Sequence, residues 1–224
     1  MDENIFMKTR FELIIFDWDG TLSDSVGLIT DLMIQSFVLH NVEPPSRGEV
    51  ADILGIKLSE AFKILLKEKN QNNSELILNS YIDLYNRSQN KVKLFDGVEY
   101  GIKELHRCGY KIAIATGGGR NYLDSCLSQT SVRNNISVTK TSDDCFSKPH
   151  PQMCNEIMDE LLIEPEKSIV IGDSIHDLQM AKNANISSLA ATYGAHNQKA
   201  LSIYNPLGYA ESADMIFDWI RKNG

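Results

Sequence analysis

Two carboxylates at the end of an apolar run are the residues of this sequence best suited to chemistry. Asp17 and Asp19 follow the stretch 11–16, and Gly20 comes directly after them. If the chain stays extended, residues two apart point to the same side, and a glycine then permits a sharp turn. Two such close carboxylates repel each other in a poorly hydrated place unless a cation or a shared proton offsets the charge. The pair therefore predicts a metal site or a catalytic site.

Three more polar side chains occupy comparable places. Thr116 follows the apolar run 111–115, and Asp173 follows the run 168–172. Lys148 precedes a proline, which disfavours helical backbone at the lysine and leaves it on an extended loop. Carboxylates suit a hard cation, whereas a hydroxyl and an ammonium suit phosphate oxygens. If these groups converge, the sequence predicts a site for a phosphate and a divalent metal.

The elements that must position these groups alternate between strands and helices. Such alternation predicts right-handed βαβ crossovers and a doubly wound parallel α/β sheet, whose ligand site lies beyond the carboxyl ends of the strands. The expected strands are 11–16, 111–115, 136–138, 168–172 and 186–191, and the expected helices are 121–129, 151–162, 176–184 and 213–221.

An all-helical insertion is expected after the first strand. Apolar residues recur at helical spacing in 26–39, 58–66 and 77–85, with a polar break at 70–73. Ser46 and Glu49 have the spacing of a capping box, which begins a short helix expected to stop near Gly55. We therefore expect an α/β core formed by 1–23 and 92–224, and a helical domain formed by 24–91.

Composition limits the classes of partner. The 224-residue chain carries a net charge of −8, which argues against nucleic acid because that binding depends on neutralising phosphates with Lys and Arg. The stretch 1–10 has no apolar centre and no run is long enough to span a membrane, so we expect a cytoplasmic protein, monomeric or homodimeric. The four cysteines form no CxxC pair and are expected to be reduced thiols.

The ordered motifs resemble the haloacid dehalogenase superfamily of phosphohydrolases. They are the stretch from Asp17 to Leu22, then Thr116, then Lys148, then the stretch from Gly172 to Asp177. The helical insertion resembles the small cap of the phosphoglycolate-phosphatase and β-phosphoglucomutase-like branch. The resemblance implies a Rossmann-like core, Mg²⁺ as cofactor and a small phosphorylated metabolite as substrate.

The resemblance also implies a role for each motif residue. Asp17 would attack phosphorus to give an aspartyl-phosphate, and Asp19 would act as general acid and then general base. Mg²⁺ would be held by Asp17, the backbone carbonyl of Asp19 and Asp173. The remaining implied roles are phosphate binding by Thr116, Gly117 and Lys148, and orientation of a water or of Lys148 by Asp177.

Three residues are weaker candidates for substrate contact. Related proteins often carry Asn or another polar residue after the threonine, and often a lysine next, whereas this chain has three glycines and Arg120. Arg120 could reach a phosphate or carboxylate, or could face solvent at a helix start. Arg47 and Gly55 belong to the helical insertion, where Gly55 matches the place of a specificity loop and Arg47 could equally be a solvated surface residue.

Several functions compete at this stage. A small-ester phosphatase acting on a phosphoglycolate-like compound or a sugar phosphate is the leading hypothesis, and a β-phosphoglucomutase-type mutase stays open. Asp19 argues against a dehalogenase, which needs no second aspartate. A receiver-like phospho-accepting switch would be about half as long and would carry its acceptor on a middle strand.

Overall fold

A parallel six-stranded sheet forms the centre of the computed structural model, which describes residues 10–66, 73–88 and 93–224. The strand order is β3-β2-β1-β4-β5-β6, and every neighbouring pair is parallel. The strands are β1 (Leu13–Phe16), β2 (Lys111–Ala115), β3 (Val138–Lys140), β4 (Ser168–Gly172), β5 (Ser187–Ala191) and β6 (Tyr209–Ala210).

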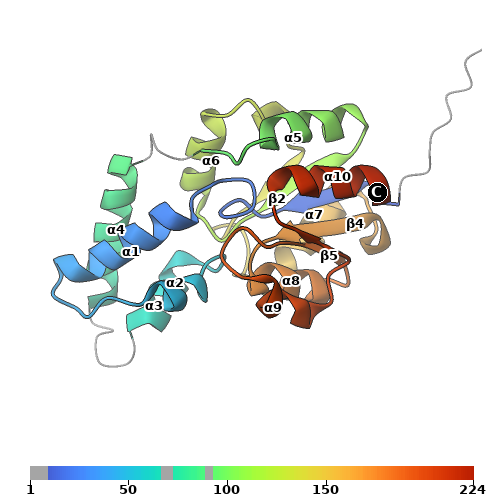
Figure 1. Cartoon of the computed structure of the whole chain (residues 1–224). Helices are drawn as coiled ribbons and strands as arrows, with labels where there is room; N and C mark the ends of the chain where they lie inside the picture. Colours follow the sequence, from blue (N-terminus) through green and yellow to red (C-terminus); the bar gives the residue numbers. More distant parts are fainter. Residues whose placement is uncertain (1–9, 67–72, 89–92) are drawn as a thin grey trace, which may run out of the picture.

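Helices cover both faces of this sheet (Figure 1). Alternate residues of a strand point to opposite faces, so Ile14 and Phe16 of β1 pack into one cluster and Leu13 and Ile15 into another. The first cluster includes side chains of α5, α6 and α10, and the second includes side chains of α7 and α8. These helices are α5 (Val98–Arg107), α6 (Arg120–Ser128), α7 (Gln152–Leu161), α8 (Ile175–Asn183) and α10 (Ala213–Asn223).

Short elements complete the sheet region. Helix α9 (Gln198–Leu201) contributes Leu201 to a small cluster with Leu178 and Ala190. Single turns of tighter helix occupy Arg133–Asn135, Pro165–Lys167 and Ser202–Tyr204. Among the described residues, no helix is both long enough and apolar enough to cross a membrane.

The register of β1 explains why polar groups gather at one edge. Phe16 lies opposite Ile114 of β2 and Ile171 of β4, and the three strands run in the same direction. The residues that follow these strands therefore emerge side by side. Asp17, Thr116 and Asp173 are all buried at that edge.

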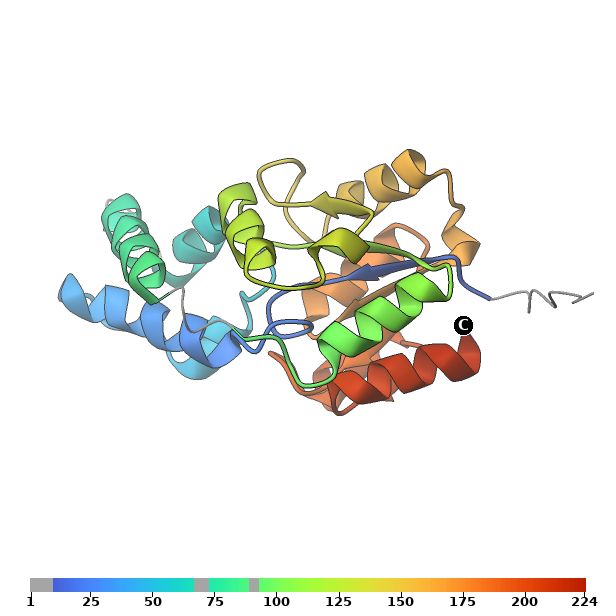
Figure 2. The same cartoon turned by 90° about the horizontal axis from the view of Figure 1, so that it is seen from above.

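A group of helices lies at one end of the molecule, beyond the sheet, as both Figures 1 and 2 show. They are α1 (Val26–Leu39), α2 (Arg47–Ala51), α3 (Leu58–Leu66) and α4 (Ser74–Ser88). Their apolar faces form a separate cluster that includes Phe37, Phe62 and Tyr81. Aromatic contacts run through it, with ring centroids 5.9 Å apart for Phe37 and Phe62 and 5.5 Å apart for Phe62 and Tyr81.

Two chain segments that connect these helices to the sheet region lie against each other. The Asp24 amide donates to the Lys93 carbonyl over 2.8 Å, and the Phe95 amide donates to the Leu22 carbonyl over 3.0 Å. The expected boundary at 91–92 lies outside the described residues, as do the stretch 1–9 and most of the polar break at 70–73. The division of the chain at 24–91 stays a prediction.

Most expected elements are confirmed, with informative differences. The helix at 26–39 and the strands at 111–115 and 168–172 have the expected bounds, and Ser46 and Glu49 form the capping box. The short helix ends at Ala51 rather than near Gly55, and β3 begins at Val138 rather than 136. Helices α5 and α9 and the two-residue strand β6 were not expected, and β6 is too short to show an alternating pattern.

Candidate functional site

Asp17 and Gly20 form the sharp end of β1. Asp17 is buried, and Gly20 has a φ of +88°, a backbone conformation that glycine adopts without a steric penalty. A Cβ atom on Gly20 would lie 2.2 Å from Oδ2 of Asp173. The turn therefore requires glycine both for its backbone angle and for the approach of Asp173.

Lys148 lies between two carboxylates beneath the sheet edge. Its Nζ donates to Oδ1 of Asp17 over 2.5 Å and to Oδ1 of Asp177 over 2.6 Å, and all three side chains are buried. Burial opposes the ammonium charge, but the two carboxylates outweigh it and raise the pKa of Lys148 above its usual value. Burial raises the pKa of Asp17 well above its usual value, although Lys148 partly offsets this. Lys148 is thus positively charged and is held against Asp17, the expected nucleophile.

Asp173 is fixed by donors from two other segments. The Thr21 hydroxyl donates to its Oδ1 over 2.9 Å, and the Ala195 amide donates to its Oδ2 over 2.6 Å. Burial and the neighbouring Asp177 raise the pKa of Asp173 to about 7. These contacts give the carboxylate one orientation.

Three of these carboxylates fit a divalent cation. Asp17, Asp173 and Asp177 each offer an oxygen, and these oxygens lie within 4.8 Å of one another. With Lys148 among them, the ionised cluster carries a formal charge of −2 in a buried place. A divalent cation would neutralise that charge and would lower the pKa values that burial raises, because metal binding favours the deprotonated ligands. Oxygen donors are also the ligands that Mg²⁺ prefers.

Asp19 stands apart from this cluster. Its Oδ1 accepts a hydrogen bond from the Ser25 hydroxyl over 2.6 Å and another from the Tyr122 hydroxyl. Burial raises the pKa of Asp19, although both hydroxyl donors oppose the rise. Burial also raises the pKa of Tyr122 well above its usual value, so the phenol stays protonated and donates. A carboxyl with a raised pKa is suited to hold and release a proton.

Thr116 and Gly117 lie beside these carboxylates at the end of β2. The Thr116 hydroxyl oxygen accepts from the Gly118 amide over 3.0 Å, which leaves its own proton available as a donor. A Cβ on Gly117 would lie 2.3 Å from the carbonyl oxygen of Gly55. The glycine therefore allows the helical region to approach this loop closely.

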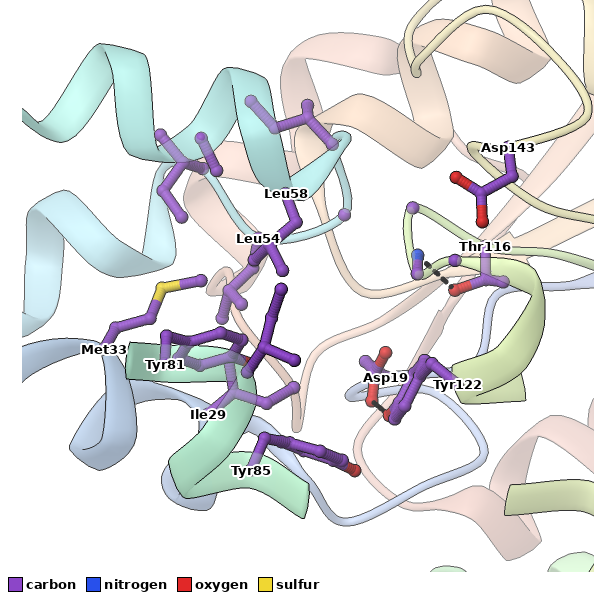
Figure 3. Close-up of a pocket in the computed structure, with 18 of the residues that line it drawn as sticks. Asp19, Ile29, Met33, Leu54, Leu58, Tyr81, Tyr85, Thr116, Tyr122 and Asp143 are labelled. Atoms are coloured by element: carbon purple, nitrogen blue, oxygen red, sulfur yellow. Dashed lines mark hydrogen bonds between the residues drawn. The ribbon is translucent and has the colours of Figure 1, made fainter. Parts of the chain in front are cut away.

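A cavity of about 380 Å³ opens above Asp17 and Asp19, between the sheet edge and α1–α4. Figure 3 shows the apolar side chains of one wall, among them Met33, Leu54 and Leu58, facing Asp19 and Thr116. The wall on the sheet side consists of Asp17, Asp19, Thr116, Gly117, Gly118, Gly119, Asn121, Tyr122 and Asp143. The opposite wall consists of Ile29, Met33, Ile53, Leu54, Gly55, Ile56, Leu58, Ala61, Tyr81, Ile82, Tyr85 and Asn86.

The loop between α2 and α3 rests directly on the sheet region. The Lys57 amide donates to the Ser147 hydroxyl over 2.8 Å, and its Nζ donates to the Ser142 carbonyl over 3.0 Å. The ring of His176 donates to the Asp52 carbonyl over 2.8 Å. Gly55, with a φ of +94°, lies in this loop and lines the cavity. These contacts hold the apolar wall over the carboxylates.

The two arginines named as substrate candidates lie elsewhere. Arg120 is bonded to the Thr139 hydroxyl and carbonyl and to Asp144, and it is not among the residues that line the cavity. Arg47 pairs with Asp31 at the surface, where both side chains are more than half exposed. Arg47 pairs with Asp31 of α1 and Arg120 pairs with Asp144 of the loop after β3, and neither arginine is among the residues that line the cavity.

For some residues of the site, the sequence pattern does not predict their position there. Tyr122 contacts Asp19 and Ala195 contacts Asp173, but nothing in their local sequence distinguishes them from helix or loop residues. Ser174 and Asp177 form a capping box, a spacing that sequence inspection can find. Thr21 directly follows Gly20 and belongs to the motif from Asp17 to Leu22.

Comparison with known proteins identifies the family. The model of the family "Haloacid dehalogenase-like hydrolase" matches residues 14–191. A phosphoglycolate phosphatase of Vibrio vulnificus (strain CMCP6) is 30% identical, over 94% of this chain and 96% of its own. The pyrophosphatase PpaX of Bacillus cereus (strain B4264) is 26% identical, over 88% and 90%. The crystal structure of a hydrolase from Pseudomonas syringae superposes with a TM-score of 0.84 at 22% identity, over 95% and 98%.

The chain therefore belongs to the haloacid dehalogenase-like hydrolases, because the family model covers most of its length. This confirms the family resemblance and the α/β fold expected from the sequence. It also argues against the alternative of a receiver-like phospho-accepting switch, since the matched family is one of hydrolases.

Proposed function

We propose that this haloacid dehalogenase-like hydrolase is a Mg²⁺-dependent phosphatase that cleaves small phosphate monoesters through an aspartyl-phosphate. The observation that supports this most directly is the contact of Asp17 with Lys148 inside the buried carboxylate cluster. The names of the relatives, phosphoglycolate phosphatase and pyrophosphatase, both describe hydrolysis at phosphorus.

In the proposed reaction a carboxylate oxygen of Asp17 attacks phosphorus. The bond between phosphorus and the alcohol oxygen breaks, and Asp19 gives its proton to that oxygen. Water then attacks the phosphorus of the acyl phosphate, gives a proton to Asp19 and releases phosphate and the Asp17 carboxylate. The hydrogen bonds from Tyr122 and Ser25 hold Asp19 in place for both proton transfers.

Phosphoryl oxygens in this site are bound by Lys148 and by the hydroxyl of Thr116, with backbone amides near Gly117. When bound to Asp17, Asp173 and the backbone carbonyl of Asp19, Mg²⁺ would offset the negative charge of phosphate and carboxylates. Asp177 also lies in the carboxylate cluster, but we assign it to Lys148, whose ammonium it contacts over 2.6 Å.

We assign residues 24–91 to a helical cap over the remaining core. The α2–α3 loop closes one side of the cavity through Lys57 and Gly55. A closed wall excludes bulk water from a reactive acyl phosphate and contacts the leaving group.

Turnover of p-nitrophenyl phosphate tests the proposal. We expect hydrolysis that requires Mg²⁺, stops with a chelator and returns when Mg²⁺ is restored. Asp17→Asn removes the nucleophile, so kcat should fall by at least about a thousand-fold. The matched control is Asp218→Asn, since Asp218 lies at the surface beside Arg221 and should leave the rate unchanged.

Two results would contradict the proposal. One is undiminished turnover by Asp17→Asn, which would exclude this residue as nucleophile. The other is an Asp19→Asn variant as fast as the parent, which would exclude the acid and base role. Mass spectrometry of acid-quenched Asp19→Asn protein should detect phosphate on Asp17 if loss of the base slows the second step more than the first.

A further inference from the structure

The cavity has a negatively charged floor, and the described residues of its walls include no positive side chain. Its described lining residues include Asp17, Asp19 and Asp143, and none is Lys, Arg or His. Two lysines lie close by without lining the cavity: Lys148, which we assign to the phosphoryl group, lies between Asp17 and Asp177, and Lys57 donates to the Ser142 carbonyl. A second anion on a substrate would therefore face carboxylates and would find no cationic side chain among the described residues that line the cavity.

The wall opposite the carboxylates is apolar and aromatic. Met33, Leu54 and Leu58 face the cavity together with the rings of Tyr81 and Tyr85 (Figure 3). Burial raises the pKa of both tyrosines, so their phenols are neutral. Transfer of a neutral hydrocarbon or aromatic group from water to such a surface is favourable, whereas a carboxylate would lose hydration with no cation in the described lining to offset the loss.

We infer that the substrate is a phosphate monoester whose leaving group is uncharged and largely apolar. This inference rests on the proposed phosphatase function and narrows its substrate class. It separates this chain from what the names of its relatives describe, because phosphoglycolate and pyrophosphate each carry a second anionic group. The cavity volume of about 380 Å³ falls in the range of sites for small organic ligands.

A matched pair of substrates tests the inference. Hexyl phosphate and the same chain ending in a carboxylate, 6-(phosphonooxy)hexanoate, share the reacting phosphorus and a very similar leaving alcohol. With Mg²⁺ present, we expect kcat/KM to be at least about tenfold higher for hexyl phosphate, equivalent to about 1.4 kcal/mol. Hexyl phosphate should also exceed methyl phosphate, whose leaving group is too small to reach the apolar wall.

Ile82 allows the charge of the wall to be changed without disturbing the core. It lines the cavity on α4 and the residue is 39% exposed, so a long polar side chain can be accommodated. Ile82→Lys should raise kcat/KM for the carboxylate ester and lower it for hexyl phosphate. Ile82→Gln is the matched control, because it adds polarity without charge and should not improve the carboxylate ester.

The outcomes separate the two proposals. If methyl phosphate is hydrolysed but the carboxylate ester is turned over as fast as hexyl phosphate, the inference is overturned and the phosphatase function stands. An Ile82→Lys variant with an unchanged ratio between the two esters would also overturn it. If no ester is hydrolysed in the presence of Mg²⁺, the phosphatase proposal fails and this inference fails with it.

Discussion

The two walls of the cavity differ in almost every physical property. The sheet wall presents Asp17, Asp19 and Thr116, held by hydrogen bonds and by a buried ion pair. The helical wall presents Met33, Leu54 and other apolar side chains that pack in their own cluster. The sheet wall thus carries the groups that the proposed chemistry needs, whereas the helical wall offers side chains that would contact the leaving group.

This difference suggests that reaction and selectivity can be altered separately. Charged groups in a buried cluster depend on one another, so removing one leaves the others unpaired. Apolar contacts are smaller and more nearly independent, so removing one changes the fit of a ligand by a limited amount. The predictions below test that contrast between the walls.

The largest effect is expected for the ion pair under the sheet wall. Lys148→Met keeps much of the side-chain volume but leaves Asp17 and Asp177 without their cation. In Mg²⁺-free buffer we expect the free energy of unfolding, measured by urea denaturation, to fall by about 3–5 kcal/mol. The matched control is Lys140→Met, because Lys140 pairs with the partly exposed Glu156 and should cost no more than about 1 kcal/mol. Equal losses in the two variants would contradict the account of Lys148.

The second effect concerns the proton carrier. Tyr122→Phe removes one hydroxyl donor from Asp19 while the ring stays in place. Because hydrogen bonds to charged groups contribute about 1.5–3 kcal/mol, kcat should fall roughly ten- to hundred-fold. Inhibition by inorganic phosphate should not change, since phosphate is bound by other groups.

Tyr81→Phe is the control for this tyrosine. It keeps the ring that packs 5.5 Å from Phe62 and lies on the helical wall. We expect its kcat to stay close to that of the parent enzyme. An equal loss of kcat in both variants would show that the effect does not depend on the hydrogen bond from Tyr122 to Asp19.

A smaller effect is expected on the helical wall. Leu58→Ala removes contact surface from the half-buried Leu58, so KM for hexyl phosphate should rise about four- to fifteen-fold, the equivalent of one or two methylene contacts. The inhibition constant of inorganic phosphate should stay the same. Leu58→Met, which conserves volume, should behave like the parent. A parallel loss of phosphate affinity would show that the walls are not independent.

The smallest effect is expected where the two regions meet. His196 is buried next to Asp52 of the helical region, with Nε2 and Oδ1 3.7 Å apart. Burial, with a contribution from His176, lowers the pKa of His196 below its usual value despite Asp52. As pH falls, His196 is therefore protonated at a higher pH in the unfolded chain than in the folded protein. Its contribution to the free energy of unfolding is complete above about pH 6.5 and is lost as pH falls below that value.

Urea titrations between pH 8 and pH 5 measure this effect. The parent should lose more stability on acidification than His196→Gln, which has no titrating ring. Identical slopes for the two proteins would show that His196 does not contribute to their pH dependence.

The sequence determined the framework of the sheet and the residues at its edge. Apolar runs of strand length gave β1, β2 and β4 because a parallel strand covered on both faces is apolar throughout. Asp17, Thr116 and Asp173 follow these runs directly, and parallel strands end at one edge, so their convergence is a consequence of local pattern and topology. The helix at 26–39 was equally readable because its apolar spacing has the helical period.

Only the tertiary structure decided which partners those residues have. Tyr122 reaches Asp19 across 103 positions of sequence, and Lys148 reaches Asp17 across 131. The guanidinium of Arg120 contacts Asp144 and Thr139 and does not line the cavity, which the local sequence did not indicate. Spacing along the chain encodes helical and strand periods, but contacts between distant residues depend on how completed elements pack. The apolar wall that selects the proposed leaving group arises in the same way, from helices whose facing side chains meet only after folding.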